Sequence, residues 1–348
     1  MTSQTKIKPK LKPLLAALRD LDETEVRQAI VDILSPTCDV RMCHPFGDLT
    51  TDSLYETCFK PLKIAFPDVE RRDAIIVSGT TPEGCDWVGC CGSYVGTFVA
   101  PFLEIPPTGH LAHMRFHEFY KVLNGQVVEV QAIWDIPELM MQASAWPMAP
   151  SLGREWATPT PMTQDGLVDR PDDKVQSNQS LTHVIDMLVA LSRHPIEPVA
   201  SMELERYWHP KMSWYGPAGI GTARGISGFR NWHQIPFLNA MPDRGQYKDE
   251  VLAHFFAEGD YVAVTGWPDM AQTMARDGWM GLVPNGQKIK LRSLDFWRME
   301  QGKIRENWVL VDLLDVYSQL GVDVFARLRE FNKARATGPI PITDEAVT

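Results

Sequence analysis

The sequence predicts an α+β protein built from two tandem copies of one domain. Residues 107–142 align without gaps on residues 284–319, and Phe66-Pro67-Asp68 matches Met241-Pro242-Asp243 upstream in the same order. In each copy, helical patterns precede a series of strand patterns, which is typical of α+β domains and not of alternating βαβ units. Identical pairs in the gapless block include Pro107 and Pro284, Gly109 and Gly286, Arg115 and Arg292, Phe119 and Phe296, Gly125 and Gly302, Glu129 and Glu306, and Asp135 and Asp312.

The first copy begins with two predicted helices. Apolar residues at positions 14, 15 and 18 recur at helical spacing, and Asp22 with Glu25 forms a capping-box pattern before a second amphipathic run. Strand patterns follow at residues 73–78 and 86–99. We expect a closing hairpin whose arms are residues 111–123 and 127–134, with Asn124-Gly125 at the turn.

The second copy repeats this order. Val184, Leu188 and Leu191 predict its first helix, and strand patterns cover residues 250–257 and 261–267. Its closing hairpin has arms at residues 289–299 and 304–311, joined by Gln301-Gly302. Apolar spacing after Asp312 predicts a helix, which residues 324–331 extend.

These patterns divide the chain into an arm, two domains, a linker and a tail. We expect a flexible arm at residues 1–10 and a first domain at residues 11–143. Residues 144–180 are rich in Pro, Ser, Thr, Asn and Asp without periodicity, which predicts a linker. The second domain is expected at residues 181–334, and a loose tail at residues 335–348.

Composition excludes several classes of partner. The 348 residues are 44% hydrophobic and 22% charged, with a formal net charge of −10. Nucleic acid and anionic membranes are therefore not expected as partners, because both need a clustered basic face. We see neither a secretory signal pattern nor the roughly 20 consecutive apolar residues of a bilayer span, so we expect a cytoplasmic protein. The six cysteines lack paired CxxC spacing, which indicates reduced thiols.

Short motifs occur in a recurring order in the two copies. In the first copy they are Gly92-Ser93-Tyr94-Val95-Gly96, Ile105-Pro106-Pro107-Thr108-Gly109, and Asn124-Gly125 followed by Glu129 and Asp135. In the second copy they are Trp214-Tyr215-Gly216-Pro217-Ala218-Gly219-Ile220-Gly221, Arg224-Gly225, Pro242-Asp243, and Glu306-Asn307-Trp308 followed by Asp312. In this order the motifs resemble the SnoaL-like polyketide cyclase family of the nuclear transport factor 2-like superfamily.

The resemblance implies a cone-shaped, cystatin-like fold in each copy, in which helices close a curved antiparallel sheet around an apolar cavity. Members of the family include intramolecular aldol cyclases, and relatives act as isomerases, epoxide hydrolases or dehydratases. Other members only bind ligands or partners, so fold alone does not fix the function. We expect the two copies to form an intramolecular pseudo-dimer, with a homodimer of the whole chain as a further alternative.

The resemblance also implies an acid/base near the end of the final strand, at Asp312 in the second copy and Asp135 in the first. A carboxylate in an apolar cavity can remove a proton next to a carbonyl, because desolvation raises its pKa. The alternative is that each Asp only caps the helix that follows it.

We expect the second copy to hold the better-formed pocket. Period-two spacing puts Glu306, Trp308 and Asp312 on one strand face, and Asp295 and Trp297 alternate likewise on the preceding strand. Asp295 and His233 are candidates to assist Asp312 in catalysis, and Tyr215 or Arg224 to bind an oxyanion. Expected substrate contacts are Trp214, Tyr215, Arg224, Trp267, Trp297, Glu306 and Trp308.

Purely structural interpretations of these residues remain open. Aromatic side chains most often fill a core, and Glu306 can form a solvated cross-strand pair with Arg292 or Arg298. A second pocket in the first copy would contain Asp135, His117 and Glu129. His113 and His117 are four apart, but that spacing is a metal signature chiefly on helices, so we expect no metal.

No P-loop, dinucleotide fingerprint, nucleophile elbow or zinc-protease motif is present, so we expect no cofactor. The leading hypothesis is an enzyme that acts on a small, largely apolar carbonyl compound, as an aldol cyclase or by the proton transfer of an isomerase or a lyase such as a dehydratase. The alternative is a non-catalytic protein that binds a small molecule in the same pocket.

Overall fold

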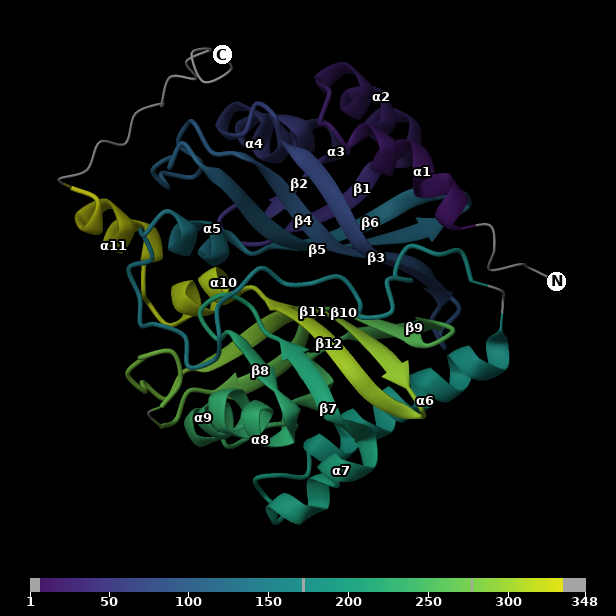
Figure 1. Ribbon diagram of the computed structural model, residues 1–348, viewed down its shortest axis with the longest axis vertical. Coiled ribbons are helices and arrows are strands. Elements are labelled where there is room, and N and C mark those ends of the chain that lie inside the picture. The colour runs from purple at the N-terminus through teal and green to yellow at the C-terminus, as the bar shows by residue number, and fades with distance from the viewer. Residues whose placement is uncertain (1–6, 171–172, 277, 334–348) are drawn as a thin grey trace.

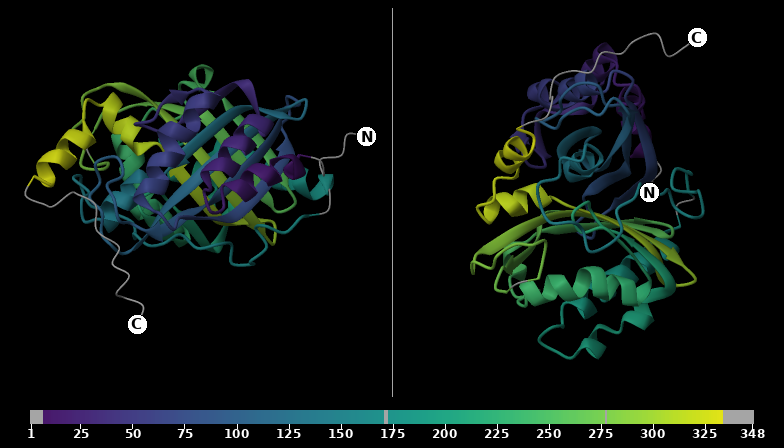
Figure 2. Two further views of the ribbon diagram at one scale, coloured as in Figure 1. Left: turned by 90° about the horizontal axis from the view of Figure 1, so that it is seen from above. Right: turned by 60° about the vertical axis from the view of Figure 1, so that its left-hand side comes forward.

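The computed structural model describes residues 7–170, 173–276 and 278–333. Two six-stranded sheets face each other at the centre of the molecule, and helices cover the outer face of each sheet (Figures 1 and 2). The two sheets have the same strand order, which confirms the two copies predicted from the repeat. The expected tail and residues 1–6 of the expected arm lie outside the described residues.

The first copy forms the sheet β2-β1-β6-β5-β4-β3. A π-helical turn at Tyr55–Phe59 joins α3 to α4, and the first helix already includes residues 8–10 of the expected arm. The elements of this copy are α1 (Lys8–Ala17), α2 (Glu23–Ile33), β1 (Leu34–Met42), β2 (Asp48–Leu49), α3 (Thr51–Leu54), α4 (Lys60–Ala65), β3 (Glu70–Thr80), β4 (Asp86–Thr97), β5 (Leu111–Leu123), β6 (Gln126–Trp134) and α5 (Ile136–Gln142).

The second copy forms the sheet β8-β7-β12-β11-β10-β9. A π-helical turn at Arg230–Gln234 again joins two short helices, here α8 and α9. The elements of this copy are α6 (Lys174–Leu191), α7 (Leu204–Tyr207), β7 (Trp208–Tyr215), β8 (Thr222–Arg224), α8 (Gly225–Phe229), α9 (Ile235–Ala240), β9 (Ala253–Glu258), β10 (Tyr261–Thr273), β11 (Lys288–Glu300), β12 (Lys303–Val311), α10 (Leu313–Gln319) and α11 (Val324–Phe331).

Both sheets are mixed, whereas the resemblance implied antiparallel ones. The first long strand of each copy, β1 or β7, runs parallel to the last, β6 or β12, while the other pairs are antiparallel. The strand β1 was not predicted from the sequence, because it follows α2 directly at Leu34 with no turn residues between them. Burial alternates only in its second half, at Cys38, Val40 and Met42.

The closing hairpins lie where the sequence predicts them. Asn124 and Gly125 have φ of 51° and 91°, and Gln301 and Gly302 have φ of 52° and 72°. Two consecutive positive φ values are the requirement of a type I′ turn, which glycine meets without strain. The hairpins bring β5 against β6 and β11 against β12, and so fix the register of both sheets.

Residues 144–170 lie across the seam between the two copies and form no helix or strand. The backbone oxygen of Gly166 accepts from the amide of Ile76 in the first sheet at 3.0 Å. The backbone oxygen of Pro159 accepts from Trp308 in the second sheet at 3.1 Å. Residues 174–180 of the expected linker belong instead to α6, which packs on β9 and β10.

Aromatic side chains fill the interface between the sheets. Phe119 and Phe296, which occupy the same position in the two copies, meet with ring centroids 5.1 Å apart. Gly89 lies against both rings, where an added Cβ would come within 2.9 Å of Phe119. The two copies therefore share one continuous core.

The described residues contain neither disulfide bonds nor helices suited to cross a membrane. All six cysteines are free thiols, and five of them are buried. Within the described ranges, we find no helix with the length and hydropathy of a bilayer span.

Candidate functional site

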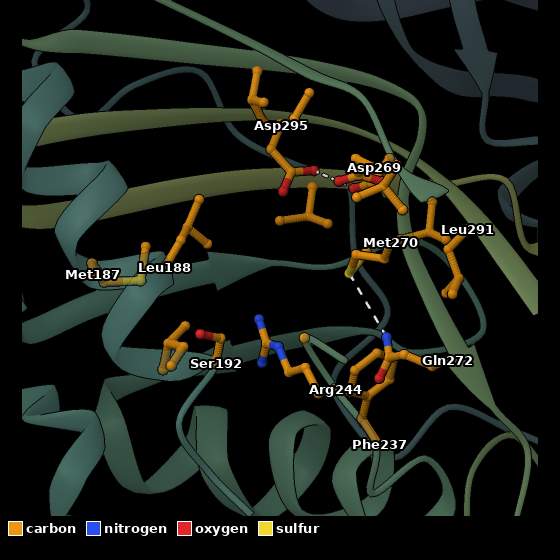
Figure 3. Close-up of a pocket in the computed structure, with 18 of the residues that line it drawn as sticks. Met187, Leu188, Ser192, Phe237, Arg244, Asp269, Met270, Gln272, Leu291 and Asp295 are labelled. Carbon is orange, nitrogen blue, oxygen red and sulfur yellow. Dashed lines mark hydrogen bonds between the residues drawn. The ribbon is translucent and has the colours of Figure 1, made fainter. Parts of the chain in front are cut away.

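The second copy encloses a cavity of about 410 Å³ between its sheet and the helices α6, α8 and α9 (Figure 3). This volume falls within the range of roughly 300–1,000 Å³ that small-molecule sites occupy. The apolar lining includes Leu188, Trp208, Trp214, Phe229, Phe237, Trp279 and Leu291. The polar lining includes Ser192, His233, Arg244, Asp269, Gln272, Ser293 and Asp295.

The corresponding space in the first copy is filled, and only about 20 Å³ remains there. Phe116 and Trp134 align in the repeat with Ser293 and Val311 of the second copy. Tyr94 lies opposite Met114 in the first sheet, where Met270 lies opposite Leu291 in the second. The smaller side chains of the second copy therefore leave the volume that large aromatic rings occupy in the first.

A carboxyl group occupies the same strand position in both copies, but only the first copy neutralises it. Glu118 accepts from Arg71 Nη1 at 2.5 Å, Tyr120 Oη at 2.7 Å, Tyr94 Oη at 3.0 Å and Trp134 Nε1 at 2.9 Å. Burial acts to raise the pKa of Glu118, but Arg71 and these hydrogen bonds hold it below its usual value. Glu118 is thus a satisfied structural carboxylate.

Asp295 aligns with Glu118 and has a different environment. Its described hydrogen-bond donor is Ser293 Oγ, at 2.7 Å. Burial raises the pKa of Asp295 to about 7, and the bond from Ser293 offsets this only in part. Asp295 can therefore exchange a proton near neutral pH.

A second carboxyl group, Asp269, lies beside Asp295 in the cavity lining (Figure 3). Burial and the charge of Asp295 raise its pKa well above the usual range. The pairing of β10 with β11 shifts register between Gly266 and Met270, and this bulge carries Asp269. An added Cβ at Gly266 would lie 1.9 Å from the Asp269 Cβ, so only glycine permits this approach.

Arg244 enters the cavity from the segment after α9, on the side opposite Asp295 (Figure 3). Burial lowers its pKa to about 10, so the guanidinium stays charged at neutral pH. Among the described residues, no carboxylate lies within the 4.0 Å of an ion pair with Arg244. The cavity lining thus contains the guanidinium of Arg244, the ammonium of Lys248, and two carboxyl groups with raised pKa values.

His233 lies on the π-helical turn Arg230–Gln234 and forms part of the aromatic wall. Its ring stacks on Trp214 with centroids 4.0 Å apart. Burial lowers its pKa to about 3, so the imidazole is neutral at working pH. Turns of this kind often mark functional positions in helices.

Most of the buried side-chain polar atoms without a protein partner belong to residues that line this cavity. Within the described part of the chain, they are Nε1 of Trp208, Trp279 and Trp297, Nδ1 of His233, Oδ1 of Asp269 and Oε1 of Gln272. Native proteins leave few buried polar groups unpaired, so such a concentration indicates groups that bond to a ligand or to water. Nowhere in the described residues do three or more His, Cys, Asp or Glu gather in a metal-binding arrangement.

The structure brings together four of the predicted site residues, Asp295, His233, Trp214 and Trp297, in the cavity lining. Tyr215, Glu306 and Trp308 instead lie on the opposite face of the sheet. The register pairs Asp295 with Val309 and Trp297 with Asn307. Asp295 and Trp297 therefore share a face of the sheet with the odd-numbered residues of β12, and the even-numbered residues of β12 lie on the other face. Glu306 is paired there with Arg298 at 2.6 Å, and Tyr215 donates to it at 3.1 Å.

Two further predicted substrate contacts also lie outside the cavity. Arg224 is exposed and donates to Ser213 Oγ at 2.6 Å. The guanidinium carbon of Arg292 lies over the indole ring of Trp267, 4.8 Å from the centroid of that ring. Neither side chain lines the cavity that holds Asp295.

Asp312 and Asp135, the acids implied by the resemblance, lie at the seam between the copies. Asp312 accepts from the backbone amide of His44 in the first copy at 2.9 Å, and it also caps α10 through Asp315. Asp135 accepts from the backbone amide of Ala218 in the second copy at 3.0 Å. Burial raises the pKa of each to about 7, yet neither lines the cavity.

The structure does not bring together the three described residues of the expected second pocket, because each has a different partner. His117 is fully buried against the backbone oxygen of Leu294 in the other copy, 2.6 Å away. Glu129 lies nearer the surface and pairs with Arg41 at 3.3 Å. Asp135 is held by Arg115 at 3.0 Å.

Asp269, Arg244 and Gln272 were not among the predicted site residues. Asp269 and Gln272 lie just beyond residue 267, where the strand pattern was expected to end, but β10 continues to Thr273. Arg244 directly follows the repeated Pro242-Asp243, at the position where the first copy has Val69. The replacement of the apolar Val69 by the charged Arg244 between the two copies was a sequence signal that could have identified Arg244 as a site residue.

Comparison with known proteins gives a family match for both copies. The model of the SnoaL-like polyketide cyclase family matches residues 14–143 and 196–320. A comparison with curated proteins found no match. Similar solved structures include IdmH from Streptomyces antibioticus, at 18% identity and a TM-score of 0.34 over 40% of this chain and 99% of that one. AclR from Streptomyces galilaeus has 17% identity and a TM-score of 0.34 over 41% and 98% of the two chains. A SnoaL-like polyketide cyclase from Agrobacterium tumefaciens has 20% identity and a TM-score of 0.30 over 40% and 95%.

Proposed function

The chain belongs to the SnoaL-like polyketide cyclase family, and on this basis we propose that its second copy is a cofactor-independent enzyme. Its substrate is a small, largely apolar carbonyl compound, and its reaction is a proton transfer of the aldol-cyclase type. The first copy supports the second and carries no active site of its own.

The observation that carries this proposal is the contrast between Asp295 and Glu118. A buried carboxyl group without a neutralising cation is unfavourable for stability, so its presence calls for a functional reason. In the first copy the equivalent position is neutralised by Arg71. In the second copy burial leaves the pKa of Asp295 at about 7, which suits a general base at neutral pH.

In the proposed reaction, ionised Asp295 takes a proton from the carbon next to a substrate carbonyl. The C–H electron pair moves into the enolate, whose oxygen accepts hydrogen bonds from protonated Asp269 and from the indole N–H of Trp297. The enolate carbon then attacks a second carbonyl of the same substrate and forms the new C–C bond. The proton held by Asp295 passes to the resulting alkoxide, which restores the base.

Deuterium exchange tests this proposal without the natural substrate. We expect the protein to accelerate exchange of the α-protons of 2-tetralone, a bicyclic apolar ketone, in D₂O as followed by NMR. Asp295→Asn should reduce this acceleration at least 100-fold, because the amide cannot take up the proton. Asp312→Asn is the matched comparison, since Asp312 has a similarly raised pKa but lies outside the cavity.

The comparison also separates the rival assignments. Loss of exchange in Asp312→Asn with full exchange in Asp295→Asn would return the catalytic role to Asp312. If 2-tetralone binds in the cavity but the wild-type protein gives no acceleration, the chain is a binding protein and the enzymatic proposal fails.

A further inference from the structure

We propose that the substrate of this cavity is an anion, a planar fused-ring or aryl carboxylate, whose carboxylate binds to Arg244. That this ligand is a substrate rests on the proposed function, but the recognition of a carboxylate can be tested by binding alone. Three features support it: the position of Arg244, the arrangement of charged groups in the two copies, and the shape of the cavity around Arg244.

Arg244 is a cation set into an apolar enclosure. Its neighbours in the lining include Leu188 and Phe237, and its guanidinium points into the cavity in Figure 3. An Arg side chain offers five N–H donors and cannot be neutralised at physiological pH. Arg244 is half-buried, and no hydrogen bond or ion pair among the described residues satisfies these donors, although the charge of Asp269 acts on the guanidinium. A cation that is withdrawn from bulk water without a bonded partner is unfavourable.

The two copies treat their buried cation and carboxylate in opposite ways. In the first copy Arg71 and Glu118 lie 2.5 Å apart, and the cavity beside Glu118 has only about 20 Å³. In the second copy Arg244 lies across the cavity from Asp295 and Asp269 (Figure 3). The fold thus has a way to pair such groups internally, and the second copy leaves its cation free for a ligand.

A carboxylate is the ligand group that best fits this cation. Guanidinium binds a carboxylate through two parallel hydrogen bonds, which gives direction as well as charge. Lys248, exposed at the rim of the cavity, adds a second positive charge on the same side. Ionised Asp295 would repel an anion at the opposite side, so the carboxylate of the ligand is oriented toward Arg244.

The aromatic walls define the rest of the ligand. Trp214 and His233 stack on each other, and Phe237 meets Trp279 edge to face with ring centroids 5.3 Å apart. Flat rings pack well between such surfaces. With its carboxylate on Arg244, a two- or three-ring molecule would extend toward Asp295 and place a carbonyl group there.

Binding of two isosteric probes tests the inference. 2-Naphthoate and 2-naphthamide differ in charge but hardly in shape, and both can be titrated calorimetrically against the full chain. We expect the wild-type protein to bind 2-naphthoate at least tenfold more tightly than 2-naphthamide. Arg244→Met should remove this preference, and Arg244→Lys should keep part of it.

The matched control is Arg224→Met, which removes an exposed arginine outside the cavity and should leave the preference unchanged. A wild-type protein that binds the amide as tightly as the carboxylate would overturn the inference, whether or not the Arg244 variants fold. So would an Arg244→Met protein of normal melting temperature that keeps the tenfold preference.

Asp295→Asn distinguishes this inference from the proposed function. If Asp295 carries the chemistry and Arg244 the recognition, the variant loses 2-tetralone exchange but still prefers 2-naphthoate. A preference for the carboxylate in a wild-type protein without exchange activity would support the binding site and reject the enzyme. Exchange without any such preference would do the reverse.

Discussion

At the scale of single residues, the chemistry of this protein depends on what surrounds a carboxyl group. Glu118 and Asp295 occupy one strand position in the two copies, and both are removed from bulk water. Four donors and the charge of Arg71 lower the pKa of Glu118, whereas a single serine leaves that of Asp295 near 7. The same position is therefore structural in one copy and reactive in the other.

The raised pKa of Asp295 predicts a pH-dependent loss of stability. The native state holds this proton up to about pH 7, while the unfolded chain releases it near 3.8. Within this window the native state binds more protons, so stability falls as pH rises. We expect Asp295→Asn to be more stable than wild type by about 1–3 kcal/mol at pH 8 and nearly equal at pH 4, measured by urea denaturation. A variant that is less stable than wild type at pH 8 would contradict this expectation.

The same pKa predicts the pH profile of proton transfer. Because Asp295 must be ionised to act as a base, the rate of 2-tetralone exchange should rise with pH and reach half its plateau near 7. The measurement is the NMR exchange rate between pH 5 and pH 8.5, corrected for the uncatalysed reaction. A corrected rate that is independent of pH over this range would exclude Asp295 as the base.

At the scale of elements, the site depends on an irregularity in β10. The bulge between Gly266 and Met270 turns Asp269 toward Asp295, and the absence of a Cβ at Gly266 makes room for it. The strand β4 of the first copy pairs with β5 without a break, so the equivalent region holds no second acid. One local change in pairing thus converts a filled sheet into a site with two carboxyl groups.

A single methyl group at Gly266 should disrupt this arrangement. Gly266→Ala places a Cβ where the Asp269 Cβ lies, so the bulge must shift and Asp269 must move away from Asp295. We expect at least a tenfold loss of 2-tetralone exchange together with a lower melting temperature.

The matched control is Gly228→Ala on α8, where the nearest atoms to an added Cβ are 3.9 Å away. Its exchange rate should equal that of wild type, and the helix should be slightly stabilised. Full exchange in Gly266→Ala would show that Asp269 has no part in the site.

The elements themselves were largely predictable, but the site was predictable only in part. Period-two patterns with an Asn-Gly turn in the first copy and a Gln-Gly turn in the second identified the hairpins, since these signals are local. Which face of β11 meets which face of β12 depends on register, and this put Trp308 and Glu306 away from Asp295. Arg244 and Asp269 come from a loop and a bulge, where periodicity carries no information.

At the scale of the whole molecule, repeated residues mark the shared architecture and differing residues mark the site. Arg115 with Asp135 and Arg292 with Asp312 recur because each pair holds a backbone amide of the opposite copy. Arg115 also donates to the backbone oxygen of Gly216 at 2.7 Å. The family resemblance implied a catalytic role for these two acids, and in the structure each carboxylate accepts a hydrogen bond from a backbone amide of the opposite copy.

Removal of these two carboxylates, which we call the seam carboxylates, should therefore reduce the stability of the protein without changing the cavity. We expect Asp135→Ala and Asp312→Ala each to lower the free energy of unfolding by about 1–3 kcal/mol, because buried amides lose their acceptor. Asp169→Ala, at an exposed acid, should change it by less than about 0.5 kcal/mol. Unchanged stability of both Asp135→Ala and Asp312→Ala, measured by thermal and urea denaturation, would show that the seam between the copies does not depend on the seam carboxylates.

We propose that the cavity of the second copy is the active site, with Asp295 at the reacting carbon. The most direct measurement is a crystal structure of the protein with 2-naphthol, a flat mimic of the enolate of 2-tetralone. We predict that 2-naphthol lies in this cavity, with its ring carbon next to the hydroxyl-bearing carbon in contact with Asp295 and its oxygen bonded to Asp269 or Trp297. Density for 2-naphthol beside Asp312, or within the first copy, and none in this cavity would contradict the claim.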